Sequence, residues 1–115
     1  MSGSVVAVLV SCSLASANAA GIPDWVLEGV APWQARDSQA ECVRGGKLWI
    51  MGGWFDSYTA PPRDVWSSAD GREWNLVSRE APWIHSDLSM SIAFRDQIWM
   101  MGGWYTGRLA GHSAS

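Results

Sequence analysis

Polar side chains that could contact a ligand lie in the loops of this sequence. His85 stands two residues before Asp87, and a carboxylate so placed can orient an imidazole as a general base. Arg36 and Asp37 could together bind a carboxylate or a sugar hydroxyl. Ordinary loop and capping roles remain open for all of these residues. The candidates for a ligand-binding face are Arg36, Asp37, Asp56, Tyr58, Arg63, His85, Asp87, Tyr105 and Arg108, whereas His112 is expected to be solvated.

No familiar catalytic motif accompanies these candidates. The sequence has no G-x-S-x-G, no phosphate-binding loop, no C-x-x-C and no metal-ligand spacing, so we predict no cofactor, no metal and no catalytic residue. The net charge is −3, and the single lysine and seven arginines form no basic stripe. Nucleic acid is therefore not an expected partner. We expect binding rather than catalysis.

The elements that must position these loops are short strands that recur along the chain. Residues 31–54 align without a gap to residues 81–104, an offset of 50, with nine identities in 24 positions. Eight of the nine tryptophans pair between copies: Trp25 with Trp74, Trp33 with Trp83, Trp49 with Trp99, and Trp54 with Trp104. A period near 50 made of short strands indicates a propeller or a solenoid.

The sequence predicts an all-β chain, because no window sustains helical periodicity without Gly or Pro. The expected strands are 24–27, 40–43, 47–52, 64–68, 73–77, 89–94 and 97–102. Gly45-Gly46, Asp70-Gly71 and Arg95-Asp96 are predicted to turn the chain between neighbouring strands. One unit is then a meander of four antiparallel strands, with its long loops at one end and its short turns at the other. Strand 47–52 is apolar on both faces, so we expect both to be covered.

Two glycines close the apolar strand in each copy, and a tryptophan follows them. The motif residues are Gly52, Gly53, Trp54, Trp66, Asp70, Gly71, Trp74, Gly102, Gly103 and Trp104. With the period of 50, this pattern resembles the kelch-repeat β-propeller family, of the bacterial galactose-oxidase-like central-domain type. The segment from Ser68 to Trp74 is also similar to the Asp-box of sialidases, with its glycine one place early. The resemblance implies antiparallel four-stranded blades in a ring of six or seven.

The chain holds fewer blades than such a ring needs. We assign residues 36–78 to one kelch blade, 79–115 to a partial second blade, and 20–35 to a closing strand and loop. The fold class expected is therefore an incomplete propeller, with about one full blade and partial blades beside it. The missing blades would come from the rest of a longer chain or from self-association.

Residues 1–19 are assigned to a signal peptide. They carry no charged side chain, have an apolar run from Val5 to Val10, and end in Ala17-Asn18-Ala19 before Ala20. The protein is then expected to be secreted or periplasmic. Two alternatives stay open: a lipoprotein signal in which Cys12 carries the lipid, and an ordinary N-terminal strand or tail. The apolar run is too short to be a transmembrane segment. Cys42, in an apolar strand, is expected to be a small buried hydrophobe.

Two functions from different classes follow. The first is an exported propeller module that binds a carbohydrate or protein ligand through its long loops. The alternative is the N-terminal piece of a propeller enzyme, galactose-oxidase-like or sialic-acid-epimerase-like, or a truncated product without function.

Overall fold

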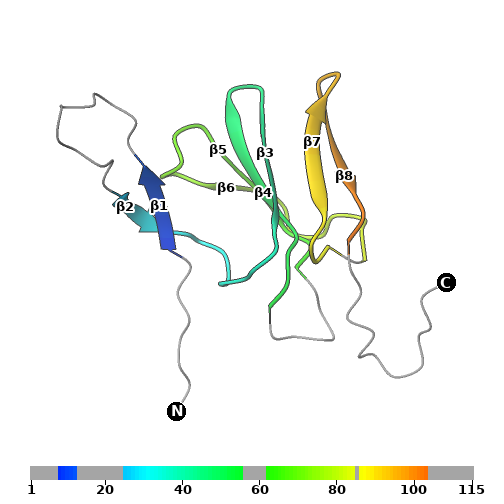
Figure 1. The fold of residues 1–115 in the computed structure, drawn as a ribbon, viewed down its shortest axis with the longest axis horizontal. Coiled ribbons are helices and arrows are strands. Elements are labelled where there is room, and N and C mark those ends of the chain that lie inside the picture. Colours follow the sequence, from blue (N-terminus) through cyan, green and yellow to red (C-terminus); the bar gives the residue numbers. More distant parts are fainter. Residues whose placement is uncertain (1–7, 13–24, 56–61, 85, 104–115) are drawn as a thin grey trace, which may run out of the picture. The chain divides into compact units, whose positions relative to one another are not determined.

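The computed structural model describes residues 8–12, 25–55, 62–84 and 86–103 (Figure 1). All regular structure in these ranges is β-strand, and none of them contains a helix, as the sequence predicts. The chain divides into two compact units, Met1–Ala35 and Arg36–Ser115. Each unit is described by itself.

A four-stranded antiparallel sheet forms the centre of the second unit. Its strands are β3 (Ala40–Arg44), β4 (Lys47–Met51), β5 (Val65–Ser68) and β6 (Asn75–Ser78), and each pairs with the next in chain order. This confirms the predicted four-stranded meander. Two further strands, β7 (Met90–Phe94) and β8 (Gln97–Met101), pair as a separate hairpin.

The hairpin β3–β4 and the hairpin β7–β8 have the same backbone geometry. Ala40 pairs with Met51 in the first, and Met90 pairs with Met101 in the second, so the register is identical at an offset of 50. The other cross-strand partners coincide in the same way. We call β3–β4 the first hairpin and β7–β8 the second hairpin.

The two hairpin turns also match. Both central residues of each turn have positive φ: 59° and 69° at Gly45 and Gly46, and 48° and 56° at Arg95 and Asp96. Positive φ at both positions is the signature of a type I′ turn, whose twist suits a two-residue hairpin loop. In the second hairpin Arg95 and Asp96 form this turn without glycine. Positive φ is strained for residues with a side chain, and the strain is smaller for aspartate than for arginine.

An indole hydrogen bond recurs in both hairpins. Trp49 Nε1 donates to the Arg44 carbonyl at 3.1 Å, and Trp99 Nε1 donates to the Phe94 carbonyl at 3.2 Å. In each case the ring lies across the strand beside the turn, where it satisfies a carbonyl at the end of the preceding strand. Trp49 and Trp99 therefore have the same local role in the two copies.

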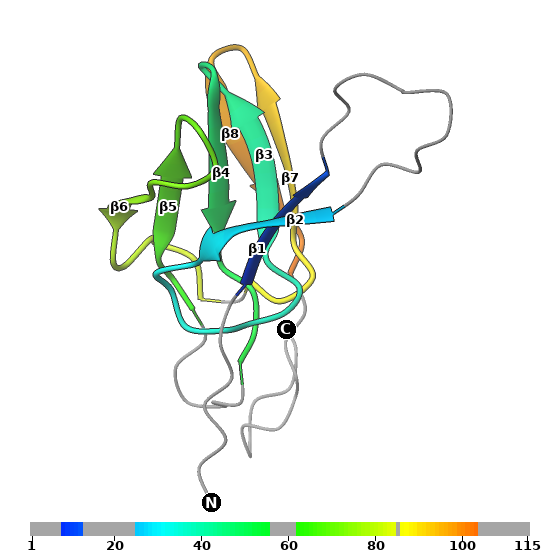
Figure 2. The ribbon, with the colours of Figure 1, turned by 90° about the vertical axis from the view of Figure 1, so that its left-hand side faces the viewer.

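The second hairpin lies alongside β3, the edge strand of the four-stranded sheet (Figures 1 and 2). β3 is close to both β7 and β8, whereas β4 has no comparable contact with either. Ala40, Met51 and Ala81 are buried among the described apolar side chains, which is a small core. The expectation that strand 47–52 is covered on both faces is wrong for one of them, because Leu48 is exposed while Met51 is buried.

The connection between β5 and β6 is longer than a two-residue turn. Ser68 Oγ accepts hydrogen bonds from the backbone N–H groups of Gly71 (2.8 Å) and Asp70 (3.2 Å). The Asp70 carboxylate accepts from the N–H groups of Arg72 and Glu73, both at 2.9 Å. Those two bonds, with the side chain of Ser68, hold the pKa of Asp70 below its ordinary value. The predicted hairpin is present, but hydrogen bonds to the side chains of Ser68 and Asp70 stabilise its loop, in place of a two-residue turn such as Gly45-Gly46.

The first unit pairs β1 (Val8–Cys12) with β2 (Trp25–Val30) in antiparallel fashion, with a register shift between Leu9 and Val10. β2 extends three residues into the stretch predicted as loop. The apolar run assigned to a signal peptide contributes the partner strand. Removal of residues 1–19 would leave β2 without that partner, and cleavage itself stays a prediction.

Candidate functional site

The described parts of the predicted ligand loops meet at one end of the sheet, around Arg36 and the diglycine Gly52-Gly53. The Arg36 side chain is only 4% exposed. Its Nη2 donates to Asp64 Oδ2 at 2.8 Å, and Nη1 bonds both Asp64 Oδ1 and, at 3.0 Å, the Gly52 carbonyl. Trp66 Nε1 adds a bond of 2.7 Å to Asp64 Oδ2. The guanidinium thus ties the loop before β3 to the end of β4 and the start of β5.

The charge of Asp64 is stabilised despite its partial burial. Burial by itself would raise the pKa of this carboxyl group. The hydrogen bonds from Arg36 and Trp66, together with the positive charge of Arg36, outweigh that effect and leave the pKa below its ordinary value. Asp64 is therefore ionised at neutral pH and forms a bidentate ion pair with Arg36 inside the unit.

Ser86 stands at the position of the second copy that Arg36 holds in the first, and it is fully buried. Its hydroxyl lies 2.9 Å from the Pro62 carbonyl and 3.3 Å from the Gly53 carbonyl, while its own carbonyl accepts the Gly53 N–H at 3.1 Å. A Cβ built on Gly52 would lie 2.5 Å from the Ser86 Cβ. One on Gly53 would lie 2.6 Å from the Asp37 carbonyl oxygen. The diglycine is needed because two other loops pack directly on its backbone.

The remaining described candidates lie around this packed centre. Asp37 is exposed, and its backbone exchanges two hydrogen bonds with Trp54, of 3.0 and 2.9 Å. Arg63 is half-exposed and reaches Glu80 with a 3.4 Å ion pair, and Asp87 is half-buried. Outside the described residues lie Asp56, Tyr58, His85, Trp104, Tyr105 and Arg108. Among the described candidates, then, Arg36 is used internally, whereas Asp37 and Arg63 reach solvent.

A shallow groove, open to solvent over most of its extent, lies at the opposite end, between the tips of the two hairpins. Its volume is about 520 Å³. The lining residues are Arg44, Trp49, Asp96, Gln97, Ile98 and Trp99. The groove therefore has one wall from each copy of the repeat.

Two indoles and three polar groups define the chemistry of this groove. Trp49 is half-buried and Trp99 is exposed. Arg44 bridges the walls: its Nε donates to the Asp96 carbonyl at 2.9 Å, and its Nη2 lies 3.0 Å from Asp96 Oδ1. With both indole N–H groups bonded to backbone carbonyls, ring surface rather than N–H is what each tryptophan offers a ligand.

Sequence reasoning placed the ligand face at the long loops and did not select the groove residues as ligand contacts. The signal was present, since Trp49 and Trp99 recur at the same distance from their turns, with Arg44 and Asp96 beside them. What the sequence did not show was that the two hairpin tips come together. That follows from the packing of the second hairpin on β3.

Cys42 is a half-buried free thiol. Burial raises the pKa of this thiol, against the opposing effects of a hydrogen bond with Ser91 and the charge of Arg44. It is therefore neutral at physiological pH and a weak nucleophile. Within the described ranges no three His, Cys, Asp or Glu side chains are grouped so that they could bind a metal ion. Those ranges also contain no helix long and apolar enough to cross a bilayer.

Comparison with known proteins finds no matching family model and no matching curated protein. The kelch resemblance accordingly rests on the residues and the geometry given above.

Proposed function

We propose that this chain is a kelch-type β-propeller repeat module that binds a carbohydrate in the groove between its hairpin tips. Three features support the propeller assignment: the four-stranded meander, the shared register of the two hairpins, and the packing of one copy against the next. The positive φ of the diglycine in both copies adds to it, 62° and 99° at Gly52 and Gly53 and 74° and 110° at Gly102 and Gly103.

The single observation that carries the binding proposal is the composition of the groove. The indole of Trp49, on the face of the first hairpin that meets the second, lies beside a guanidinium, a carboxylate and an amide, within about 520 Å³. Sugar rings have apolar C–H faces that pack on aromatic side chains and hydroxyl groups that bond to such polar groups. Binding sites of this kind combine apolar and aromatic surface with a few convergent polar groups.

The test is a screen of neutral and acidic oligosaccharides, followed by calorimetric titration of the best one. Trp49→Ala should weaken binding about tenfold, because a lost aromatic contact costs about 0.5–1.5 kcal/mol beyond its buried area. Trp25→Ala is the control, since Trp25 is an exposed indole of the first unit. Equal losses in the two variants, or no sugar bound at all, would contradict the proposal.

The long-loop end provides the competing site within the same experiment. Arg63→Ala removes a half-exposed cation there without touching the groove. If Arg63→Ala abolishes binding and Trp49→Ala does not, the ligand uses the loop face that the sequence predicts. A peptide or protein ligand would appear as binding of partner proteins with no sugar response.

Export is part of the proposal and has its own test. N-terminal sequencing of the mature protein should find Ala20 first if residues 1–19 are removed, and an intact Met1 would refute cleavage. The enzyme alternative stays a prediction, because much of the candidate loop face lies outside the described residues.

A further inference from the structure

Each hairpin has two faces, set by the alternation of side chains along paired strands. The front face of the first hairpin consists of Ala40, Cys42, Arg44, Lys47, Trp49 and Met51, and its back face consists of Glu41, Val43, Leu48 and Ile50. In the second hairpin the front face consists of Met90, Ile92, Phe94, Gln97, Trp99 and Met101, and the back face consists of Ser91, Ala93, Ile98 and Met100. Equivalent residues are 50 apart.

Within the chain, the front face of the first hairpin meets the back face of the second. The side chain of Ser91 is hydrogen-bonded to Cys42, and Ser91 Oγ also donates to the Glu41 carbonyl at 2.7 Å. The Met100 Cε atom lies 3.3 Å from the point where a Cβ of Gly52 would stand. The contact is head-to-tail, since it joins two different faces.

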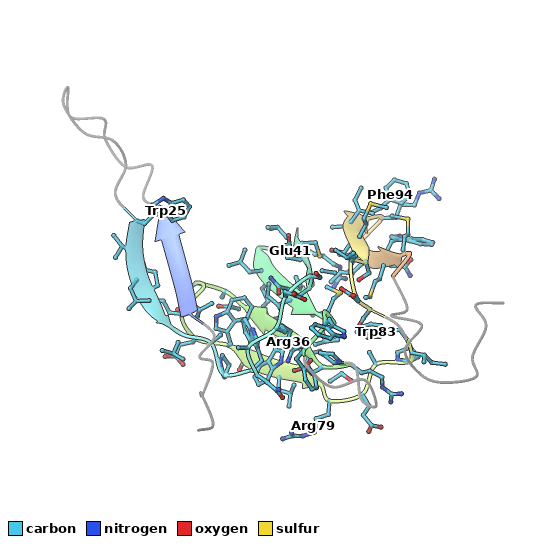
Figure 3. All side chains as sticks on the ribbon, turned by 60° about the horizontal axis from the view of Figure 1, so that its bottom comes forward. Trp25, Arg36, Glu41, Arg79, Trp83 and Phe94 are labelled. Atoms are coloured by element: carbon cyan, nitrogen blue, oxygen red, sulfur yellow. The ribbon has the colours of Figure 1, made fainter. Side chains whose placement is uncertain are left out.

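The next junction of the same kind is open at one side of the unit. Met90 is 68% exposed, whereas its equivalent Ala40 is 2% exposed. Met101 is 46% exposed, and its equivalent Met51 is 3% exposed. Ile92, Phe94 and Trp99 are exposed as well, so the front face of the second hairpin is uncovered, and it is apolar except for Gln97 beside the turn; Figure 3 shows Phe94 at the margin of the unit.

The matching back face of the first hairpin is uncovered too. Val43 and Leu48 are both exposed, while Ile98, the equivalent of Leu48, is half-buried in the internal contact. The second unit of each chain therefore exposes one front face and one back face. These are the same two kinds of face that already pack together once within the chain. A contiguous apolar surface of this kind marks an interaction site.

We propose that the front face of the second hairpin docks on the back face of the first hairpin of a second copy of this chain. A second copy is the expected partner because the new contact would repeat the internal one, in which a front face and a back face with the same backbone geometry already pack together. This junction lacks the Arg44–Asp96 ion pair, since Phe94 and Gly46 occupy the equivalent positions. A head-to-tail contact adds copies in one direction, and it yields a closed ring where the rotation per copy permits.

The proposal goes beyond sugar binding and is tested on the full chain by sedimentation velocity over a range of concentrations. The wild type should associate beyond the monomer. Ile92→Glu blocks the front face and Val43→Glu blocks the back face, so each alone should be monomeric. Mixed together they should form a one-to-one heterodimer, because each keeps the face that the other has lost.

Matched controls separate this contact from general stickiness. Ile84→Glu and Val77→Glu place the same charge at exposed Ile and Val positions outside the two open faces, and both should associate like the wild type. Met90→Glu is a second front-face variant if Ile92→Glu fails to give a folded circular dichroism spectrum. A monomeric wild type, single variants that still associate, controls that dissociate, or a mixture without heterodimer would each overturn the proposal. A monomer that still binds sugar would leave the proposed function standing.

Discussion

Replacement of Gly52 by alanine measures how tightly the second copy of the repeat packs on the first. The matched variant is Gly46→Ala. Both glycines have left-handed backbones, with φ of 62° and 69°. They differ in their surroundings, because a Cβ on Gly46 would meet no atom within 4 Å, whereas one on Gly52 would lie 2.5 Å from the Ser86 Cβ and 3.3 Å from Met100 Cε.

The expected energies follow from that difference. A side chain in the left-handed region costs about 1–2 kcal/mol, and this part is the same at both positions. Forcing a methyl group into a packed site costs about 1–3 kcal/mol more. Gly46→Ala should therefore lower the free energy of unfolding by about 1–2 kcal/mol, and Gly52→Ala by about 2–5 kcal/mol.

Urea unfolding followed by tryptophan fluorescence gives both values, provided that the transitions are two-state. Ser86→Gly removes the atom that the new methyl group strikes, so it should cost less in the Gly52→Ala background than in the wild type, with a coupling of about 1 kcal/mol or more. Equal costs for the two alanine variants would refute the close packing. Strictly additive effects of Gly52→Ala and Ser86→Gly would refute the assignment of the clash to Ser86.

Three further predictions concern the polar groups that hold the unit together. Arg36→Leu should lower the free energy of unfolding by about 3–5 kcal/mol in a denaturant titration, because it leaves a partly buried carboxylate without its ion-pair partner. Since the pKa of Asp64 is lower in the folded state, its contribution to stability is present above the unfolded pKa of about 3.9 and is lost as the pH falls through the folded value. Asp64→Asn should therefore flatten the dependence of stability on pH below about pH 5, and an unchanged slope would contradict this. Ser68→Ala should cost about 1–3 kcal/mol by the same titration, because it removes the acceptor for the N–H groups of Asp70 and Gly71.

The hairpins could be predicted from the sequence because their signals are local. Alternating or continuous apolar runs marked the strands, and the turn residues fixed where they ended. The predicted strands 40–43 and 97–102 correspond to Ala40–Arg44 and Gln97–Met101 in the structure. Because the two copies align without a gap at an offset of 50, the strand pairing in one hairpin also predicts the strand pairing in the other.

Long-range pairings could not be predicted in the same way. Arg36 and Asp64 are 28 residues apart, and no local sequence pattern around either residue identifies the other as its ion-pair partner. The pairing of β1 with β2 joins an uncharged segment, which the sequence assigns to a signal peptide, to a strand beyond residues 13–24, and no residue pattern in either strand identifies the other as its partner. Coverage of a strand face depends on which element packs there, so the exposure of Leu48 was beyond any periodicity argument.

Arg36 and Ser86 occupy one structural position in two copies, yet both end at the same diglycine. The guanidinium reaches the Gly52 carbonyl from its own copy, and the serine closes on Gly53 from the following copy. A designed tandem array of identical 36–78 segments would put an arginine where Ser86 now fits beside the bare Gly52 backbone. Such an array could not reproduce this joint, so a consensus version of the repeat needs a small residue at this position in every copy that packs on a preceding one.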